Sequence, residues 1–567
     1  MEKIIQTKIK EVLKNLEIEE VVFSIEHPED FKNGDYSTNI AMVCASKIGI
    51  NPKDLAIKIK EDFEKDLPKE IEKIEVAGPG FINFYLSRKF FTENVNDILN
   101  KKENWGRGTI LSGKKVMVEY TDPNPFKPFH IGHLMANAIG ESVSRVVEFS
   151  GAKTIRANYQ GDVGPHVAKA IYGIIKKGMP EENLSVSEKA QYIGTCYSEG
   201  SNLYDIDENI KKEIEDINRK IYAKSDADIN KIYDWGRKIT LDAFEDIYKL
   251  LGTKFDYYFF ESEMAKIGEK IVRENIGNVF EESDKAIVFH GENYDKKLHT
   301  RVFINSQGLP TYETKEIGLT LSKFEKENLD ISIVTTAIEQ ADYMKVVQKA
   351  ISLMYPEIEK KMLHITHGMM KLATGKMSSR KGNIITGESL INDSMEVVRE
   401  KVSGRDLAEE EKDLIAKTVG VAALKYSILK SSLGSDIIYD FEKSISFEGD
   451  SGPYLQYTSV RANSILKKTD KFNMDDKNNI PEEITDLEKL LYQLPEIVEY
   501  SYKTLDTHHI STYLTKLASA FNAFYGNTQI LVEENKCMVY HLSLIKAFYQ
   551  TMKNGLWLLG IETPEKM

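Results

Sequence analysis

The spacing of apolar positions sets the first 95 residues apart from the rest of the chain. Five apolar residues near the start recur at helical intervals, at Ile4, Ile5, Ile9, Val12 and Leu13. Two apolar runs, 74–76 and 81–86, flank the turn residues 78–80 and predict a pair of strands. We therefore expect residues 1–95 to form an independent α+β domain.

From residue 114 the pattern becomes strand, helix, strand. An apolar run at 116–120 predicts a strand, helical spacing follows over 133–149, and a second strand is predicted at 154–158. This β-α-β order is typical of the start of a Rossmann-like fold.

The next part of the chain predicts an insertion in that fold. Residues between about 180 and 256 are charged and helical in pattern, with Trp235-Gly236-Arg237 leading a helix whose apolar residues have core spacing. We expect the interrupted sheet to resume with strands at 302–304 and 331–335.

Beyond Val398 helical patterns dominate, at 414–430, 454–467, 487–504, 510–525 and 539–559. They predict a C-terminal all-α bundle, in which the polar stretch 468–479 is a surface loop. The predicted class is α/β, with a Rossmann-like domain at 96–440, the α+β domain at 1–95 and the bundle at 441–567. Because the Rossmann-like domain has its own core, we expect it to stay folded without the residues beyond about Asp440.

Length and composition narrow the class of protein only slightly. A chain of 567 residues is too long for one core, so about three or four domains are expected. No run of about 18 apolar residues and no secretory leader is found, so we expect a cytoplasmic protein that makes no use of a membrane. The isolated Cys44, Cys196 and Cys537 argue against a disulfide framework or a thiolate zinc site. The net charge of -13 neither supports nor excludes RNA, because tRNA binding needs only local basic faces.

The string His130-Ile131-Gly132-His133 comes after the first predicted Rossmann strand and the proline-rich residues 122–129. A strand, a tight loop and a helix start would place helix N–H groups and two imidazoles where the phosphates of a bound nucleotide lie. Taken alone, the same string is also compatible with one capping and one surface histidine.

A second string, 375–383, forms a compact glycine-bounded segment with three cations that could close over a triphosphate. Alone, it would more often be a solvated turn. Paired in this order and at this separation, the two strings resemble the HIGH and KMSKS signatures of class I aminoacyl-tRNA synthetases. That resemblance implies that the Rossmann-like domain is catalytic and that its nucleotide is ATP.

Further strings resemble arginyl-tRNA synthetases across nearly the full chain. Residues 34–39 and 78–83 resemble the appended N-terminal domain, which that family uses to contact the tRNA elbow. Residues 519–525 and 553–561 resemble the family's anticodon-binding domain. The resemblance implies a monomeric ligase that activates L-arginine with ATP and transfers it to the 3′-terminal adenosine of tRNA(Arg).

The resemblance also assigns residues to ATP. His130 and His133 would donate to phosphate oxygens, and Lys127 would replace the signature lysine whose position is held by Ser379. The remaining ATP-site candidates are Gly132, Lys376, Met377, Ser378, Arg380 and Lys381, of which the three cations would clamp the pyrophosphate. Mg2+ would accompany ATP, and no protein metal ligand is assigned. No general base is assigned either, because the arginine carboxylate is already a competent nucleophile.

An arginine substrate presents a planar cation that carboxylates and hydroxyls hold best. Tyr312 and Glu316 are four residues apart on one predicted helix face, and they match the family's arginine-reading helix, where aspartate is usual in place of Glu316. Glu119 matches a further acidic family position, while Asn124 and Gln340 match positions that hold the substrate's α-amino end.

The predicted bundle carries aromatic residues beside a cation, which can stack on unpaired anticodon bases and hold the backbone. The candidates for tRNA binding are Tyr454, Gln456, Tyr457 and Arg461. For any single tyrosine, core packing is the alternative.

Three other functions are weighed against this assignment. A small-molecule nucleotidyltransferase would have no use for the helical bundle, and a non-catalytic RNA-binding relative should have lost the histidines or the cationic segment. A zinc hydrolase using His130 and His133 lacks an obvious third ligand nearby in the sequence.

Overall fold

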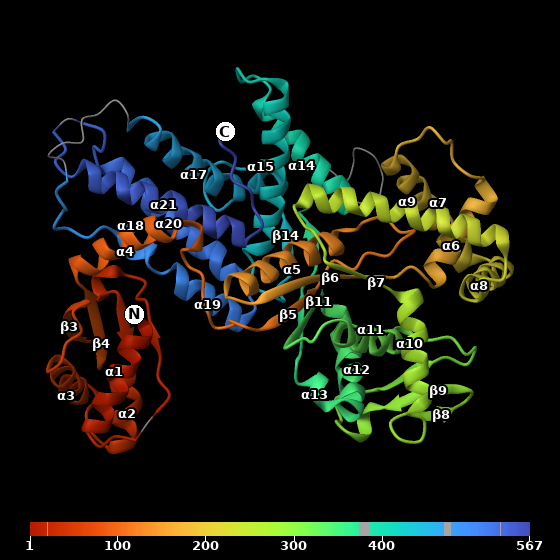
Figure 1. The fold of residues 1–567 in the computed structure, drawn as a ribbon, viewed down its shortest axis with the longest axis horizontal. Helices are drawn as coiled ribbons and strands as arrows, with labels where there is room; N and C mark the ends of the chain where they lie inside the picture. Colours follow the sequence, from red (N-terminus) through yellow and green to blue (C-terminus); the bar gives the residue numbers. More distant parts are fainter. Residues whose placement is uncertain (20, 374–385, 470–477, 533) are drawn as a thin grey trace. The chain divides into compact units, whose positions relative to one another are not determined.

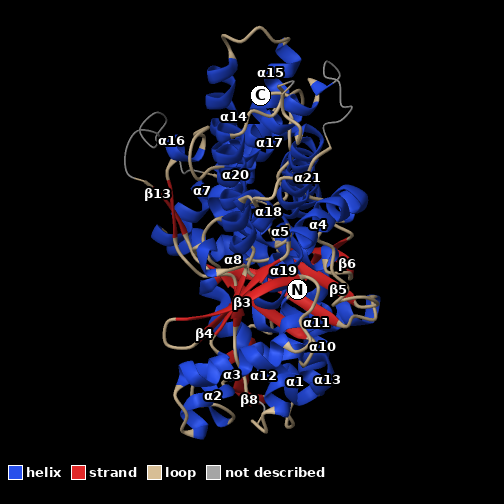
Figure 2. Cartoon of the chain, turned by 90° about the vertical axis from the view of Figure 1, so that its left-hand side faces the viewer, coloured by secondary structure: helices blue, strands red, loops and turns tan. Residues whose placement is uncertain are grey.

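The computed structural model describes residues 1–19, 21–373, 386–469, 478–532 and 534–567, and these fall into two compact units (Figure 1). The first unit consists of residues 1–105, 461–495 and 516–554. The second consists of residues 106–460, 496–515 and 555–567. Helices predominate in both units (Figure 2). Among the described residues, the helices are too short or too polar to cross a membrane.

The first unit begins with the predicted α+β domain. Its antiparallel sheet has the order β1-β2-β4-β3, with strands β1 (Ile25–Glu26), β2 (Tyr36–Thr38), β3 (Ile71–Ala77) and β4 (Phe81–Leu86). The accompanying helices are α1 (Glu2–Asn15), η1 (Phe31–Asn33), α2 (Ile40–Ile48), α3 (Pro52–Glu64), α4 (Arg88–Lys101) and η2 (Lys102–Asn104). The apolar stripe of α1 is buried at Ile5, Ile9, Val12 and Leu13, as its spacing predicts.

The C-terminal helices are α17 (Gly452–Leu466), α18 (Asp486–Leu491), α19 (Leu494–Thr504), α20 (His508–Asn527) and α21 (Met538–Leu558). The single helix predicted over 487–504 is wrong, because the chain breaks between α18 and α19. Pro495 stands in the first turn of α19, where its missing N–H costs nothing, but a helix continuing through it would lose a hydrogen bond. Within the first unit, Arg88 of α4 contacts Glu488 and Tyr540.

The second unit is built on a parallel five-stranded sheet with the order β12-β11-β5-β6-β7. Its strands are β5 (Lys115–Glu119), β6 (Lys153–Gln160), β7 (Tyr257–Phe260), β11 (Ile331–Ala337) and β12 (Met362–His367). The chain moves from β5 outward to β7 and then returns to the other side of β5. Between β5 and β11 the strand order reverses, and ligands of open α/β sheets bind beyond the carboxyl ends of the strands at such a point.

The segment 302–304 does not join this sheet, contrary to the prediction. It belongs to β10 (Thr300–Ile304), which pairs antiparallel with β9 (Ala286–His290), and β9 pairs in turn with β8 (Glu281–Ser283). A short local connection favours this hairpin over a long parallel crossover.

The helices of the second unit up to the inserted segment are α5 (Ile131–Phe149), α6 (Pro165–Lys177), α7 (Val186–Ile206), α8 (Glu208–Ala223) and α9 (Ala227–Leu251). The predicted helical insertion is therefore present, but Gly236 lies inside α9 and does not lead it. The helix begins earlier because Asp226 accepts from the N–H groups of Asp228 and Ile229. Gly236 is needed at mid-helix, since a Cβ there would lie 2.3 Å from the ring of Phe126.

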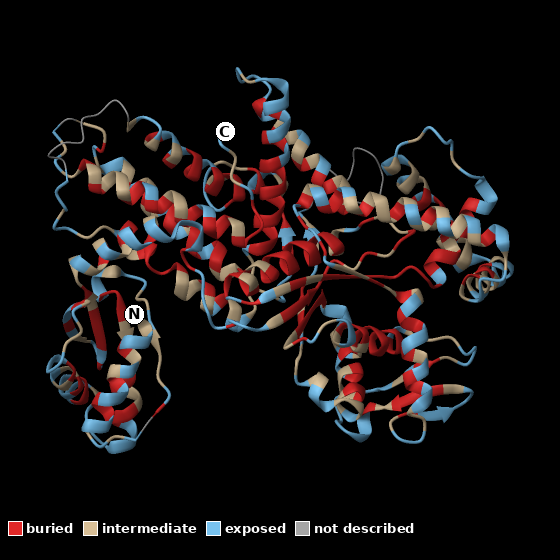
Figure 3. Cartoon of the chain, in the orientation of Figure 1, coloured by how far each residue is buried: buried red, intermediate tan, exposed pale blue. Residues whose placement is uncertain are grey.

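The remaining elements of the second unit include the small parallel pair β13 (Met370–Leu372) and β14 (Ile437–Tyr439). The helices are α10 (Glu261–Glu274), η3 (Gly291–Asn293), α11 (Tyr312–Lys326), η4 (Ile338–Gln340), α12 (Ala341–Met354), α13 (Pro356–Glu359), α14 (Gly387–Val402), α15 (Glu409–Leu429) and α16 (Phe441–Ser444). Helix α11 is buried along most of its length, although it carries several charged residues (Figure 3).

The last residues of the chain pack inside the second unit. Ser142 Oγ donates to Leu558 O at 2.8 Å, and the buried Lys425 Nζ donates to Gly560 O at 2.7 Å. The Rossmann-like domain thus shares buried hydrogen bonds with residues beyond Asp440, and removal of those residues would leave the buried donors Ser142 and Lys425 without these partners.

Candidate active site

The site lies where the strand order reverses, in the loop that leaves β5. Three residues of this loop have left-handed backbones, Thr121 (φ 81°), Asp122 (φ 46°) and Phe126 (φ 68°). Such conformations are costly for residues other than glycine, and most of all for a β-branched one. Two of the three are held by side-chain hydrogen bonds, since Asn137 donates to Thr121 Oγ1 at 3.0 Å and the Tyr159 N–H donates to Asp122 Oδ1 at 2.8 Å.

His130 and His133 cap the start of α5 reciprocally. The His133 N–H donates to His130 Nδ1 at 3.3 Å, and the His130 N–H donates to His133 Nδ1 at 3.2 Å. The two rings stack with centroids 3.4 Å apart. Glycine suits position 132 because a Cβ there would lie 3.0 Å from the His130 ring. Since both Nδ1 atoms accept hydrogen bonds, the proton of each neutral ring must be on Nε2.

Both imidazoles are neutral at physiological pH. Burial and then the charge of Lys127 lower the pKa of His130 to about 4. Burial also holds the pKa of His133 well below its usual value, with added repulsion from His130 and Lys127. The two rings therefore present Nε2–H donors without adding positive charge.

A group of carboxyls lies between the end of β5 and helix α11. Glu119 is 1% exposed and Glu316 is 8% exposed, and Lys323, which is 2% exposed, pairs with Glu119. Burial and then the charge of Glu119 raise the pKa of Glu316 to about 8. Burial and Glu119 also hold the pKa of Asp122 well above its usual value.

Three carboxyls, Glu119, Asp122 and Glu316, thus share the single ammonium of Lys323. We call these four residues the acid cluster. A cation entering the cluster would favour the ionised carboxyls and relieve their mutual repulsion. This is the electrostatic environment expected of a site for a basic substrate.

A second buried ion pair, which sequence analysis missed, lies beside the acid cluster. Lys315 Nζ donates to Glu261 at 2.6 Å, and both residues are buried. The same ammonium lies 5.1 Å from the ring centroid of Tyr312. Tyr312 itself is 57% exposed, whereas Glu316 on the same predicted helix face is buried.

Asn124 lies against the end of β6. A Cβ at Gly161 would approach Asn124 Oδ1 to 2.2 Å and Glu261 Oε1 to 3.1 Å, so glycine leaves room for both side chains. Gln340 is exposed, and its Oε1 accepts from the Tyr343 hydroxyl at 3.1 Å. Burial and then Glu316 hold the pKa of Tyr343 well above its usual value. Tyr343, which bonds to Gln340, therefore lies within electrostatic range of Glu316.

The turn after β6 contributes two further residues that sequence analysis missed. Asp162, fully buried, accepts from the Ser262 N–H and from Arg237 Nε, each at 2.9 Å. His166 Nε2 donates to Gly161 O at 2.8 Å, and burial lowers its pKa to about 3, with Lys127 adding to the shift. The signal in the sequence was Gly161-Asp162 followed by Gly164-Pro165, a turn directly after a predicted strand.

The cation-rich segment lies outside the described residues, so the predicted residues of that segment are not placed, namely Lys376, Met377, Ser378, Ser379, Arg380 and Lys381. The chain is described again from Thr386, which forms an antiparallel bridge with His130. The Gly387 N–H donates to Phe129 O at 2.8 Å. Thr386 and Gly387, which follow the segment in the chain, are therefore held beside Phe129 and His130.

The predicted tRNA-binding residues of α17 differ in their exposure. Gln456 is fully buried, and its amide donates to Glu562 O at 2.6 Å and to Thr418 O at 3.3 Å. Its assignment to tRNA is therefore wrong, because both donor hydrogens are used inside the protein. Tyr457 is 45% exposed, whereas Tyr454 is half-buried. Within the first unit, the exposed guanidinium of Arg461 lies 4.5 Å from the ring centroid of Tyr525.

Three family models match successive parts of the chain. The model of the arginyl-tRNA synthetase N-terminal domain matches residues 3–86. The catalytic-domain model of class I tRNA synthetases (R) matches residues 94–441, and the DALR anticodon-binding domain matches residues 455–567.

Relatives match over the full length. The chain is 31% identical to the Arginine–tRNA ligase of Clostridium perfringens, covering 100% of this chain and 99% of that protein. It is 32% identical to the Arginine–tRNA ligase of Fusobacterium nucleatum, with 100% and 98% covered. The solved arginyl-tRNA synthetase of Thermus thermophilus has the same fold, with a TM-score of 0.83, 22% identity and 100% of both chains covered. The chain belongs to the arginyl-tRNA synthetases, a family of class I aminoacyl-tRNA synthetases.

Proposed function

We propose that this chain activates L-arginine with ATP and transfers the arginyl group to the 3′-terminal adenosine of tRNA(Arg), with the acid cluster holding the arginine guanidinium. The observation that carries the proposal is the imbalance of charge at the reversal point of the sheet, where Glu119, Asp122 and Glu316 share Lys323. A guanidinium supplies the missing positive charge, and its planar donors suit carboxylates.

The other end of the substrate would be held by polar groups around the acid cluster. Asn124 at the end of β6 and Gln340, through Tyr343, are the candidates for the α-amino end. Tyr312 would cover the substrate from the start of α11, where its hydroxyl and ring are partly open to solvent. In this arrangement Glu261 holds Lys315, which keeps a second cation away from the acid cluster.

Phosphate oxygens of ATP would receive the two histidine Nε2–H groups and the first N–H groups of α5. The reciprocal cap supports this role, because it fixes the tautomers of His130 and His133 before the nucleotide arrives. Lys127 lies near enough to lower the pKa of both rings, so it can add a positive charge on the same side.

Mg2+ would enter as its complex with ATP, neutralising phosphate charge. The residues of the site fit that role because they offer hydrogen-bond donors to phosphate and leave the ion to phosphate oxygens and water. In particular, the Nδ1 atoms of His130 and His133 are already used by backbone N–H groups.

The first chemical step joins a carboxylate oxygen of arginine to the α-phosphorus of ATP and breaks the bond from that phosphorus to the bridging oxygen. Pyrophosphate leaves with the electron pair, and arginyl-adenylate remains. The carboxylate carries no proton at neutral pH, so the site has to align the reactants and stabilise charge on the phosphates. Lys376, Arg380 and Lys381 would hold the leaving pyrophosphate, and Gly132, Met377, Ser378 and Ser379 would complete the ATP site.

In the second step, a hydroxyl oxygen of the terminal adenosine bonds to the arginyl carbonyl carbon, and the mixed-anhydride bond from that carbon to the phosphate oxygen breaks. AMP leaves with the electron pair of that bond, and the hydroxyl proton passes to the departing phosphate or to water. Tyr454, Tyr457 and Arg461 are the candidates for the anticodon contact. Their support is the exposure of Tyr457 and of Arg461 on one helix.

Each segment of the chain has its own role. Residues 1–95 contact tRNA, residues 96–440 carry out catalysis, and residues 441–567 bind the anticodon. We propose that the enzyme works as a monomer in the cytoplasm. Its three cysteines are free thiols, which suits a reducing compartment.

The proposed function is tested by charging assays with radiolabelled arginine, ATP and tRNA(Arg). The expected result is arginyl-tRNA formation that Glu119→Gln and Glu316→Gln each reduce through a higher KM for arginine. His299→Ala, at an exposed position outside the site, serves as the matched control. Charging with another amino acid in place of arginine would overturn the proposal.

A further inference from the structure

The corner between α19 and α20 gathers two histidines and a carboxylate away from the site described above. Asp506, His508 and His509 offer donor atoms that all lie within 4.8 Å of one another, and all three residues are half-buried. We infer that these three side chains form a binding site for a divalent transition-metal ion of the zinc class. The three residues belong to the second unit.

The donor set suits such an ion. One carboxylate oxygen and two imidazole nitrogens are ligands that zinc prefers, and three protein ligands leave a fourth position for water. A hard ion such as Mg2+ would favour oxygen ligands and is a poorer match to two imidazoles.

One ring nitrogen of His508 is available to bind a metal ion. Its Nδ1 is buried and has no hydrogen-bond partner among the described residues. The same atom lies 2.7 Å from Asp506 Oδ1 without the alignment of a hydrogen bond. Two ligand atoms on one tetrahedral zinc are about 3.3 Å apart, given metal–ligand bonds of about 2.0 Å. A small side-chain movement therefore opens the space for the ion.

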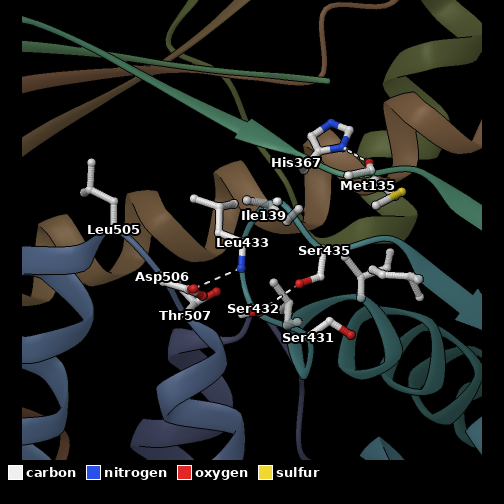
Figure 4. A pocket seen from close by; sticks show the side chains of 15 residues that line it. Met135, Ile139, His367, Ser431, Ser432, Leu433, Ser435, Leu505, Asp506 and Thr507 are labelled. Carbon is white, nitrogen blue, oxygen red and sulfur yellow. Dashed lines mark hydrogen bonds between the residues drawn. The ribbon is translucent and has the colours of Figure 1, made fainter. Parts of the chain in front are cut away.

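Asp506 is oriented by a bond outside the proposed metal site. Its Oδ2 accepts from the Leu433 N–H at 2.9 Å, as the dashed line in Figure 4 shows. Oδ1 faces His508, whose backbone N–H donates to it at 3.2 Å. A carboxylate ligand whose second oxygen is held by the protein is a common support in metal sites.

His509 is also held in place by its neighbours. Its ring centroid lies 3.9 Å from that of His508 and 4.6 Å from that of Tyr500.

A small open pocket adjoins the corner on the side of Asp506. Leu505, Asp506 and Thr507 line it together with Met135 and His367 (Figure 4). Of the residues proposed above for arginine or ATP, those that the structure describes do not line this pocket.

A metal ion at this corner would stabilise the contact of Asp506 with the segment that leads through β14 and β13 toward the cation-rich segment. Leu433 belongs to the segment that runs into β14, and β14 pairs with β13. The strand β13 ends at Leu372, shortly before the cation-rich segment begins at Gly375. Because the ion would bind the folded corner only, it should stabilise the folded protein.

The test uses the full-length protein after removal of metals with a chelator, in buffer without ATP. Titration with Co2+ should give visible absorption bands of a low-symmetry site and a stoichiometry of one ion per chain. Competition with a chromophoric chelator should show that Zn2+ displaces Co2+, and Zn2+ should raise Tm.

Asp506→Asn and His509→Ala should each lose the Co2+ bands and the Zn2+-dependent rise in Tm, while His299→Ala should keep both. The asparagine can still accept from the Leu433 N–H, so its effect reports the metal more than the fold. If wild type binds no Co2+, or if both variants bind as much as wild type, the inference is wrong. Asp506 would then act only as a cap at the start of α20.

Discussion

The backbone N–H groups of His130 and His133 each donate to Nδ1 of the other residue, so a single structural device fixes both imidazoles. Histidine side chains at a helix start usually have freedom to flip and to change tautomer. Here the cap removes that freedom, and both Nε2–H groups are available before a nucleotide binds. Because both donors are already oriented, the two side chains need no reorganisation when charge develops on the phosphates.

Replacing His133 by Ala should therefore lower the rate of adenylate formation with little change in arginine affinity. The variant loses one donor to developing phosphate charge and also the fixed orientation of His130, so we expect a loss of about 100-fold or more. ATP–pyrophosphate exchange measures the rate, and calorimetry measures arginine binding. An unchanged exchange rate would rule out the proposed role of the cap.

Arginine binding should release a proton near neutral pH. Burial and Glu119 raise the pKa of Glu316 to about 8, so this carboxyl is protonated in the free protein at pH 7. A bound guanidinium favours the ionised form, and affinity for arginine should therefore rise with pH up to about 8 and then level off. Calorimetry in two buffers of different ionisation enthalpy counts the protons released.

Glu316→Gln should release fewer protons and bind arginine more weakly. Equal proton release by the variant and by wild type would place the titrating group elsewhere, with Asp122 as the next residue to test.

The same carboxyl predicts how stability depends on pH in the absence of arginine. The folded protein holds a proton on Glu316 up to pH of about 8, whereas the unfolded chain loses it near the usual value of 4.5. Its contribution to the free energy of unfolding is therefore lost as pH rises between these two values.

Glu316→Gln should show a smaller loss of stability from pH 5 to pH 9 than wild type does. Urea unfolding at both pH values measures this difference. A steeper loss in the variant would mean that Glu316 is ionised in the free protein.

Gln456 and Tyr457 are neighbours in sequence with opposite expected effects. Gln456→Ala removes two buried hydrogen bonds and should lower the free energy of unfolding by about 1–3 kcal/mol. Tyr457→Ala should leave Tm nearly unchanged and raise the KM for tRNA, because an exposed aromatic surface is lost. Thermal unfolding and charging kinetics on both variants separate the two roles, and a normal KM for tRNA in Tyr457→Ala would remove it from the interface.

The parts of the fold that sequence predicts well are those with a strong local pattern. The strand that ends at Glu119 is a short apolar run followed by turn residues, and the helix after His130 and the helical insertion have apolar residues at helical spacing. The strand at 302–304 was given to the wrong sheet because an apolar run does not reveal its partner. The break at Pro495 was missed because proline is tolerated in the first turn of a helix.

The site was only partly predictable for a related reason. Glu119 and Glu316 could be found from matches to family positions, but the lysines that pair within the site could not. Lys315 and Lys323 look like surface charges of a helix in the sequence, and both are buried by the packing of α11. Their roles depend on tertiary contacts that bring β5, α10 and α11 together.

The buried excess of carboxyl groups in the acid cluster should make the site select a cationic substrate. The direct test is ATP–pyrophosphate exchange in the presence of tRNA(Arg), comparing arginine with citrulline, which has nearly the same shape but no charge. We expect kcat/KM for citrulline to be lower by about 1,000-fold or more, since unpaired carboxyls would remain buried in its complex. Glu316→Gln should reduce the difference in kcat/KM between arginine and citrulline. Equal use of arginine and citrulline by the wild-type enzyme would contradict selection by charge.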